Sequence, residues 1–223
     1  LHYSLRYIWE NQLPLSLGVI CNLPPCPHKN IHDYYKRLWD MVIDEKGKQI
    51  LHLMTACDFN WPQGSILMTL DPEGKSLPEY VVALRAIRHL TKATELGDTL
   101  FHASLKEFVR THEDHKFYRK DCIEKALVWL SSPMTPEYVC WAHQWRLKAQ
   151  LGDFESLISG PCRSWGIDSV VKRFPTKDIL RILSLSCHAA LQKNRLPDYL
   201  YNALLRDYLE WLYEAHGDCL ELL

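Results

Sequence analysis

The sequence lacks an excess of charge of either sign. Its 223 residues include 26 Lys and Arg against 27 Asp and Glu, which gives a net charge of −1. A polybasic nucleic-acid arm and an acidic disordered tail are therefore excluded. Long apolar runs are also missing, because no stretch reaches the roughly 18 to 20 residues that a membrane span needs. We therefore expect no membrane association.

Glycine is scarce, and the glycine motifs of common enzyme sites are absent. None of the nine Gly belongs to a G-x-G-x-x-G or G-x-x-x-x-G-K-[ST] motif, and G-x-S-x-G is missing as well. The H-E-x-x-H motif of zinc proteases does not occur either. These absences favour a protein that is not an enzyme. A metal-dependent or cysteine-based enzyme remains an alternative that they do not exclude.

Cysteine is present, but its use does not indicate a disulfide framework. Eight Cys are spread over 223 residues, whereas dense disulfides are typical of much smaller secreted domains. Residues 1–10 lack a basic segment followed by an apolar one, the pattern of a secretory signal. We therefore expect reduced, mostly buried thiols in an intracellular protein of the cytoplasm or nucleus.

Helix signals are abundant. Ser76–Glu79 fits a capping box, and the apolar spacing behind it predicts a helix to about Leu96. Thr135–Glu137 places a capping Thr, a Pro and an acidic residue in the order that begins a helix. Further helices are expected after Thr176 and from Pro197, with shorter ones over 32–54, 98–112, 119–131 and 167–173.

The expected last helix carries an apolar stripe at helical spacing, and strands are nearly absent. The stripe consists of Leu200, Leu204, Tyr208, Trp211, Leu212 and Ala215. Only Ser65–Leu70 is expected to be a short strand or an extended loop, because turn signals flank it on both sides.

A Gly-Asp pair recurs after three helical stretches, at 97–98, 152–153 and 217–218. Glycine tolerates the left-handed conformation that ends a helix, and the Asp carboxylate can cap the next one. Each pair is therefore predicted to stop one helix and begin another. The intervals are too irregular for a strict tandem repeat.

These signals together predict one all-α domain over residues 1–223. We expect stacked antiparallel helix pairs, either HEAT-like α-solenoid packing or an irregular multi-helix bundle. The Pro-containing segment 1–32 is expected to pack on this domain. The chain begins with Leu rather than Met, so we expect it to be a fragment of a longer protein.

The densest group of polar ligands lies near the start of the chain. Two thiols and two imidazoles fall within twelve residues, and zinc takes four such ligands. The spacing of these residues fits a zinc knuckle poorly, so we expect no cofactor and keep zinc as the alternative. The four candidate ligands are Cys21, Cys26, His28 and His32. A second polar run, 111–115, contains two His and is expected to form a solvated turn.

Local charge is uneven although net charge is not. Residues 172–195 are mostly basic and 198–223 mostly acidic, so the two segments could complement each other across a helical hairpin. A second basic stripe and a run of cations and aromatics at 116–120 add to the alternative of nucleic-acid binding. The basic candidates for partner contact are Arg85, Arg88, Lys92, Lys172, Arg173, Lys177 and Arg181.

Two tryptophans, Trp61 and Trp165, fall in predicted loops. An exposed loop Trp is a candidate hot spot for a protein partner, although it can equally fill a gap between helices. With numerous helices and no catalytic motif, we expect a non-enzymatic helical scaffold that binds proteins within a larger intracellular complex. The alternative is a helical protein that binds nucleic acid through its basic faces.

Overall fold

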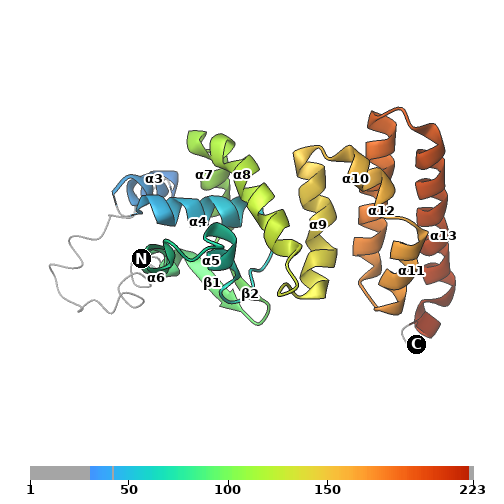
Figure 1. The fold of residues 1–223 in the computed structure, drawn as a ribbon, viewed down its shortest axis with the longest axis horizontal. Coiled ribbons are helices and arrows are strands. Elements are labelled where there is room, and N and C mark those ends of the chain that lie inside the picture. Colours follow the sequence, from blue (N-terminus) through green and yellow to red (C-terminus); the bar gives the residue numbers. More distant parts are fainter. Residues whose placement is uncertain (1–30, 42, 221–223) are drawn as a thin grey trace. The chain divides into compact units, whose positions relative to one another are not determined.

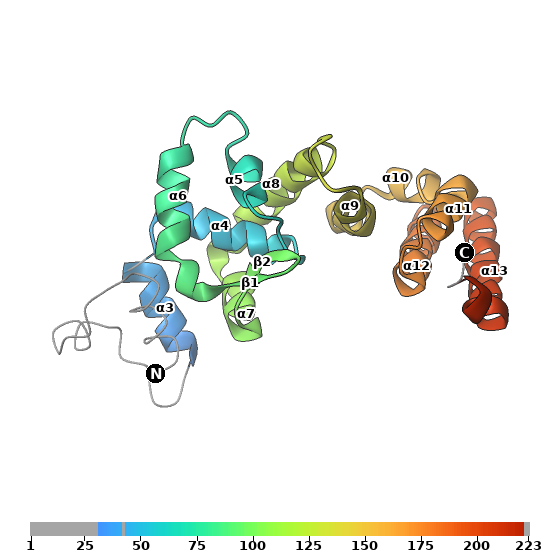
Figure 2. The ribbon, with the colours of Figure 1, turned by 90° about the horizontal axis from the view of Figure 1, so that it is seen from below.

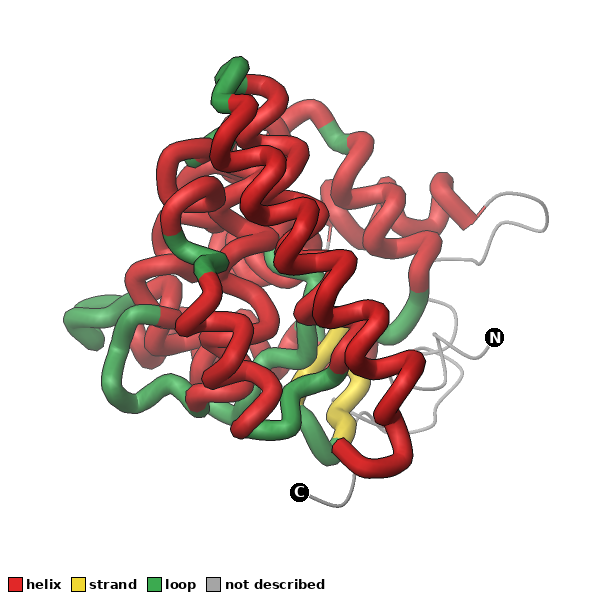
Figure 3. The backbone as a smooth tube through the Cα atoms, turned by 90° about the vertical axis from the view of Figure 1, so that its right-hand side faces the viewer, coloured by secondary structure: helices red, strands yellow, loops and turns green. Residues whose placement is uncertain are grey.

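The computed structural model describes residues 31–41 and 43–220, and these are mostly helical. Helices α3 to α13 and one two-stranded sheet make up the described part of the chain (Figure 1), so the all-α fold class is confirmed. Figure 3 shows the short hairpin as the one strand pair among these helices. The stacking of helices as a solenoid or a bundle stays a prediction.

Contacts divide the chain into two compact units, Leu1–Trp129 and Leu130–Leu223. We call them the N-terminal and the C-terminal unit and describe each by itself. The single domain expected over 1–223 stays a prediction. Nearly all of the segment 1–32 lies outside the described residues, and its expected packing is therefore not tested.

The N-terminal unit is arranged around one buried helix. That helix, α4, packs against α5, α6, α7 and β2 (Figures 1 and 2). Its residues 50–56 are all buried. The elements of this unit are α3 (Ile31–Met41), α4 (Glu45–Ala56), α5 (Ser65–Leu70), α6 (Leu77–Ala86), the 3₁₀-helix η1 (Arg88–Leu90), β1 (Thr91–Thr94), β2 (Gly97–Leu100), α7 (Ala103–Thr111) and α8 (Glu113–Leu130).

Two local predictions in this unit are wrong. Ser65–Leu70 is helix α5 rather than a short strand or an extended loop, and the hydroxyl of Thr69 donates to the Ser65 carbonyl at 2.8 Å, a bond from residue i to i−4. Ser76 caps α6 without a side-chain bond. Its backbone N–H instead donates to the Asp71 carboxylate at 2.7 Å, so the turn before the helix supplies the acceptor.

The helix predicted to reach Leu96 ends at Ala86, and a β-hairpin follows it. Strands β1 and β2 pair antiparallel, with Thr94 opposite Gly97. The backbone of Trp61 joins β2 through two hydrogen bonds with Asp98, at 2.8 and 2.7 Å. Gly97 therefore lies in a strand, at φ +129, and does not end a helix as predicted. These long-range strand contacts override the helical spacing of the sequence.

The C-terminal unit consists of helices alone in its described part. They are α9 (Glu137–Leu151), α10 (Phe154–Ser159), α11 (Arg163–Val171), α12 (Thr176–Gln192) and α13 (Leu196–Leu220). Gly152 ends α9 at φ +73, and the Asp153 carboxylate accepts the Ser156 N–H at 3.2 Å, as predicted. The Gly-Asp pair at 217–218 does not stop a helix, since α13 continues through it.

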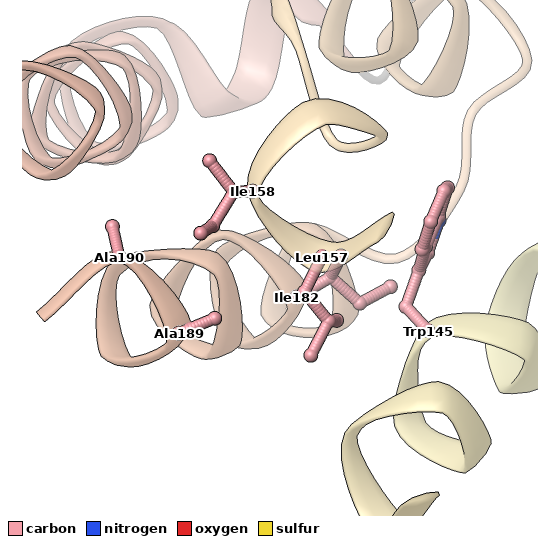
Figure 4. Close-up of a cluster of buried hydrophobic side chains, with 6 residues drawn as sticks. All are labelled: Trp145, Leu157, Ile158, Ile182, Ala189 and Ala190. Carbon is pink, nitrogen blue, oxygen red and sulfur yellow. The ribbon is translucent and has the colours of Figure 1, made fainter. Parts of the chain in front are cut away.

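Helix α12 forms the centre of this unit. One face packs on α9 and α10 through a cluster that also contains Trp145 (Figure 4). Helix α13 returns along α12 after a tight turn in which Asn194 adopts φ +55 (Figure 1). The cluster in Figure 4 consists of Trp145, Leu157, Ile158, Ile182, Ala189 and Ala190.

Candidate functional site

Helix α13 is apolar on two opposite sides. Its inner side packs on α12 and carries the buried Leu209 and Asn202, whose amide donates to the Ser186 hydroxyl at 2.8 Å. The other side carries large apolar side chains that have between 50% and 70% of their surface exposed. We call this side the outer stripe, and it consists of Leu196, Leu200, Tyr201, Leu204, Tyr208 and Trp211.

The outer stripe follows from the spacing of its residues. Leu196, Leu200, Leu204 and Tyr208 are four residues apart, so they line one side of a helix. Of the apolar stripe that the sequence predicts, Leu200, Leu204, Tyr208 and Trp211 are exposed, whereas Leu212 is half-buried and packs on the core. A surface helix normally has polar residues on the side opposite its core. The departure from that rule makes this face the strongest candidate for a binding surface.

Acidic residues adjoin one edge of the outer stripe. Asp207, Glu210 and Glu214 are exposed, and Asp207 accepts from the Arg206 guanidinium at 2.6 Å. At the other end of the helix, Lys193 is exposed in the turn that precedes α13, with its ammonium 5.7 Å from the centre of the Phe154 ring. Beside it, Arg195 forms ion pairs with Asp198 and Glu155, so this end of the stripe is mixed in charge, whereas the other end is mostly acidic.

The two candidate tryptophans lie in different environments. Trp61 has 0% of its surface exposed and packs on Phe59 and Trp129, so the expectation of an exposed contact residue is wrong for it. Trp165 is half-buried and stacks on Trp141 with 5.8 Å between ring centres. Its ring packs against the cluster of Figure 4 and against a second core cluster that contains Trp141 and Ile179, so it fills a gap between helices.

The predicted stripe of Arg85, Arg88 and Lys92 is not one helix face. Arg85 lies on α6, Arg88 on η1 and Lys92 on β1. The Arg88 guanidinium donates to the Asp98 carboxylate at 2.8 Å. Both arginines line an open groove of about 530 Å³ beside the hairpin, with Gln63, Leu67 and Asp98 among its other walls. The positive charge of one of the two arginines in this groove is thus already paired with a carboxylate of the same unit.

The basic residues around α12 divide in a similar way. Lys172 follows α11 and forms an ion pair with Glu137 of α9. Arg173 has φ +57 at the end of the same helix and is exposed. Lys177 and Arg181 are exposed on α12, one helical turn apart. The structure therefore brings only two of the four candidates onto one helix face.

Two histidines form a buried pair that the sequence does not indicate. The Nδ1 atoms of His52 on α4 and His115 on α8 lie 3.1 Å apart, so one ring donates a proton to the other. The pKa of both rings is lowered to about 4, mainly by burial, with nearby cationic groups contributing to the same shift. Residues 111–115 are thus not a solvated turn throughout, because His115 has 3% of its surface exposed.

The zinc hypothesis falls largely outside the described residues. Three of the four candidates, Cys21, Cys26 and His28, lie outside the described residues, whereas His32 lies in the first turn of α3. His32 and His112 line one shallow pocket of about 420 Å³. Within residues 31–41 and 43–220, no group of three or more His, Cys, Asp or Glu could hold a metal ion.

No family model, curated protein or solved structure matches the chain. None of the described helices combines the length and the apolar composition that a membrane crossing requires.

Proposed function

We propose that the chain is a non-enzymatic helical scaffold that binds protein partners, and that the outer stripe of α13 is its contact surface. The observation that carries this proposal is the exposure of six large apolar side chains on one side of a helix whose opposite side is already packed. Continuous exposed apolar patches rimmed by polar residues are typical of protein interaction sites. Tyr and Trp, which are frequent in binding hot spots, supply half of the stripe.

The arrangement of helices gives a physical reason for such a surface. In stacked helical proteins each layer covers the apolar face of its neighbour, and the end layers need a polar outer face. On helix α13 the outer stripe takes up much of that face, with acidic residues at its edge. The buried thiols of Cys57, Cys122 and Cys187 favour the reducing environment of an intracellular protein.

The experiment compares the wild-type chain with Leu204→Glu during affinity purification. Leu204 has 70% of its surface exposed, so the substitution should leave the helical content and the thermal unfolding temperature unchanged. Val128→Glu on α8 is the matched control, because Val128 is 72% exposed outside the stripe. The proposal expects a protein that wild type and Val128→Glu retain and Leu204→Glu loses, and that binds the purified wild-type chain directly. Identical sets of bound proteins for all three would contradict it.

A further inference from the structure

We propose that the outer stripe of α13 is the contact surface between two copies of this chain, which pair with their α13 helices antiparallel. This inference rests on the proposed scaffold function and names the partner. A two-fold symmetric pair places the same surface on both subunits, so one patch must complement itself. The stripe meets this requirement because Leu204 lies at its centre, with apolar residues on both sides along the helix.

The size of the patch fits a stable pair. A large side chain has about 150–250 Å² of surface, and the six side chains of the stripe have 50% to 70% exposed. The stripe thus offers on the order of 600 Å² in each copy, or about 1,200 Å² in a pair, the lower limit for specific interfaces. Acidic and basic groups at its edges add to this area.

The charges beside the stripe select the antiparallel direction. In a parallel pair, Glu210 and Glu214 would lie next to their own copies, and like charges repel. In an antiparallel pair centred on Leu204, Glu214 lies across from the turn that contains Lys193 and Asn194 of the second copy. That end of the helix also carries the positive end of the helix dipole. The acidic end of each copy therefore meets Lys193 and the positive helix end of the other.

The pairing is tested by sedimentation equilibrium of the full 223-residue chain over a range of concentrations. Wild type and Val128→Glu should form a dimer with the same dissociation constant. Leu204→Glu should weaken the dimer at least 100-fold, because the two introduced carboxylates meet at the symmetry axis without water. Circular dichroism and thermal unfolding confirm that each variant is folded. A wild-type chain that stays monomeric, or a Leu204→Glu chain that dimerises as wild type does, overturns the proposal.

Charge reversal tests the direction of the helices. Lys193→Glu alone, and Glu210→Lys with Glu214→Lys, should each weaken the dimer about 3- to 30-fold. A mixture of the two variants should form a heterodimer of nearly wild-type affinity, because each reversed end then meets an opposite charge in its partner. A mixture no tighter than the separate variants would contradict the antiparallel arrangement.

The same variants separate this inference from the proposed function. If wild type is monomeric but Leu204→Glu still loses a protein partner, pairing is wrong and the scaffold function holds with a different protein on the stripe. If Leu204→Glu changes neither dimerisation nor partner binding, both proposals are wrong.

Discussion

The Nδ1 atoms of His52 and His115 share one proton across 3.1 Å in the interior of the N-terminal unit. His52 also lies against the ring of Tyr118, with 4.8 Å between ring centres. Both imidazoles are neutral at pH 7, because burial lowers the pKa of each to about 4. Protonation of both rings would remove this arrangement, because both Nδ1 atoms would then be donors.

The first prediction concerns acid stability. The unfolded chain has histidines of pKa near 6.5, so between pH 6.5 and 4 it binds more protons than the folded chain. Stability is therefore full above pH 6.5 and falls as the pH drops towards 4, by roughly 3 kcal/mol for the first ring of the coupled pair to be protonated. Urea unfolding at a series of pH values measures this loss.

His115→Leu should make that pH dependence shallower, since only one histidine of the pair remains. It should also lower the free energy of unfolding at pH 7 by about 1–3 kcal/mol, because the His52 Nδ1 loses its partner. His188→Leu on α12 is the control, as His188 is exposed. Equal pH profiles for His115→Leu and wild type would show that the pair does not set the acid sensitivity.

The second prediction concerns the close approach of Gly97 to Trp61. A Cβ at Gly97 would overlap the Trp61 carbonyl, and its φ of +129 is one that other residues rarely adopt. Gly97→Ala should therefore destabilise the N-terminal unit by about 3 kcal/mol or more. Gly74→Ala is the matched control: φ is +71 but the surrounding space is open, so it should cost only about 1 kcal/mol. Thermal unfolding of both variants decides between steric overlap and backbone strain alone.

The third prediction concerns a relay of two hydrogen bonds in the C-terminal unit. The Trp141 indole donates to the Ser169 hydroxyl at 2.7 Å, and that hydroxyl donates to the Trp165 carbonyl at 2.6 Å. Ser169→Ala should cost about 1–3 kcal/mol, because the buried Trp141 N–H is left without an acceptor. Ser184→Ala, which removes an exposed bond from a hydroxyl to a carbonyl four residues earlier, should change stability little. Equal losses in both variants would contradict a special role of the relay.

The fourth prediction orders the described thiols by reactivity. The Ser164 hydroxyl lowers the pKa of Cys162, which is partly exposed, whereas burial raises the pKa of Cys122 to about 12 and that of Cys57 further. Iodoacetamide at pH 8 should therefore modify Cys162 first among these three, since the thiolate is the reactive form. Peptide mapping by mass spectrometry over time gives the order. Ser164→Ala should slow Cys162 and leave the other two unchanged, and earlier modification of Cys57 would contradict the buried position.

The sequence predicts helices well where local chemistry decides them. Thr135–Glu137 and Thr176 place the starts of α9 and α12 within about a residue, and Gly152 with Asp153 is correct in detail. The hairpin at Thr91–Leu100 is not predictable in this way, because it depends on backbone bonds to Trp61, far away in the sequence. His115 is similar, since its partner lies on another helix.

For the candidate site, the sequence predicts the stripe but not its direction. Periodicity identifies the stripe through Leu200, Leu204 and Tyr208, but it cannot say whether that side of the helix faces the core. In α13 both sides are apolar, and the inner one is chosen by Leu209 and by the bond between Asn202 and Ser186. The outward direction of the stripe follows only from packing against α12.

The two backbone hydrogen bonds between Trp61 and Asp98 also fix the path of the chain between these residues. They bring the two ends of the segment 62–97 together. The elements α5, α6 and β1 therefore belong to one long segment whose ends are joined by backbone hydrogen bonds. Within this segment, residues 72–75 between α5 and α6 are exposed. After a proteolytic cut at residues 72–75, the two fragments would still be joined by the backbone bonds between Trp61 and Asp98. A sequence inserted at the same place would leave the two ends of the segment paired in the same way.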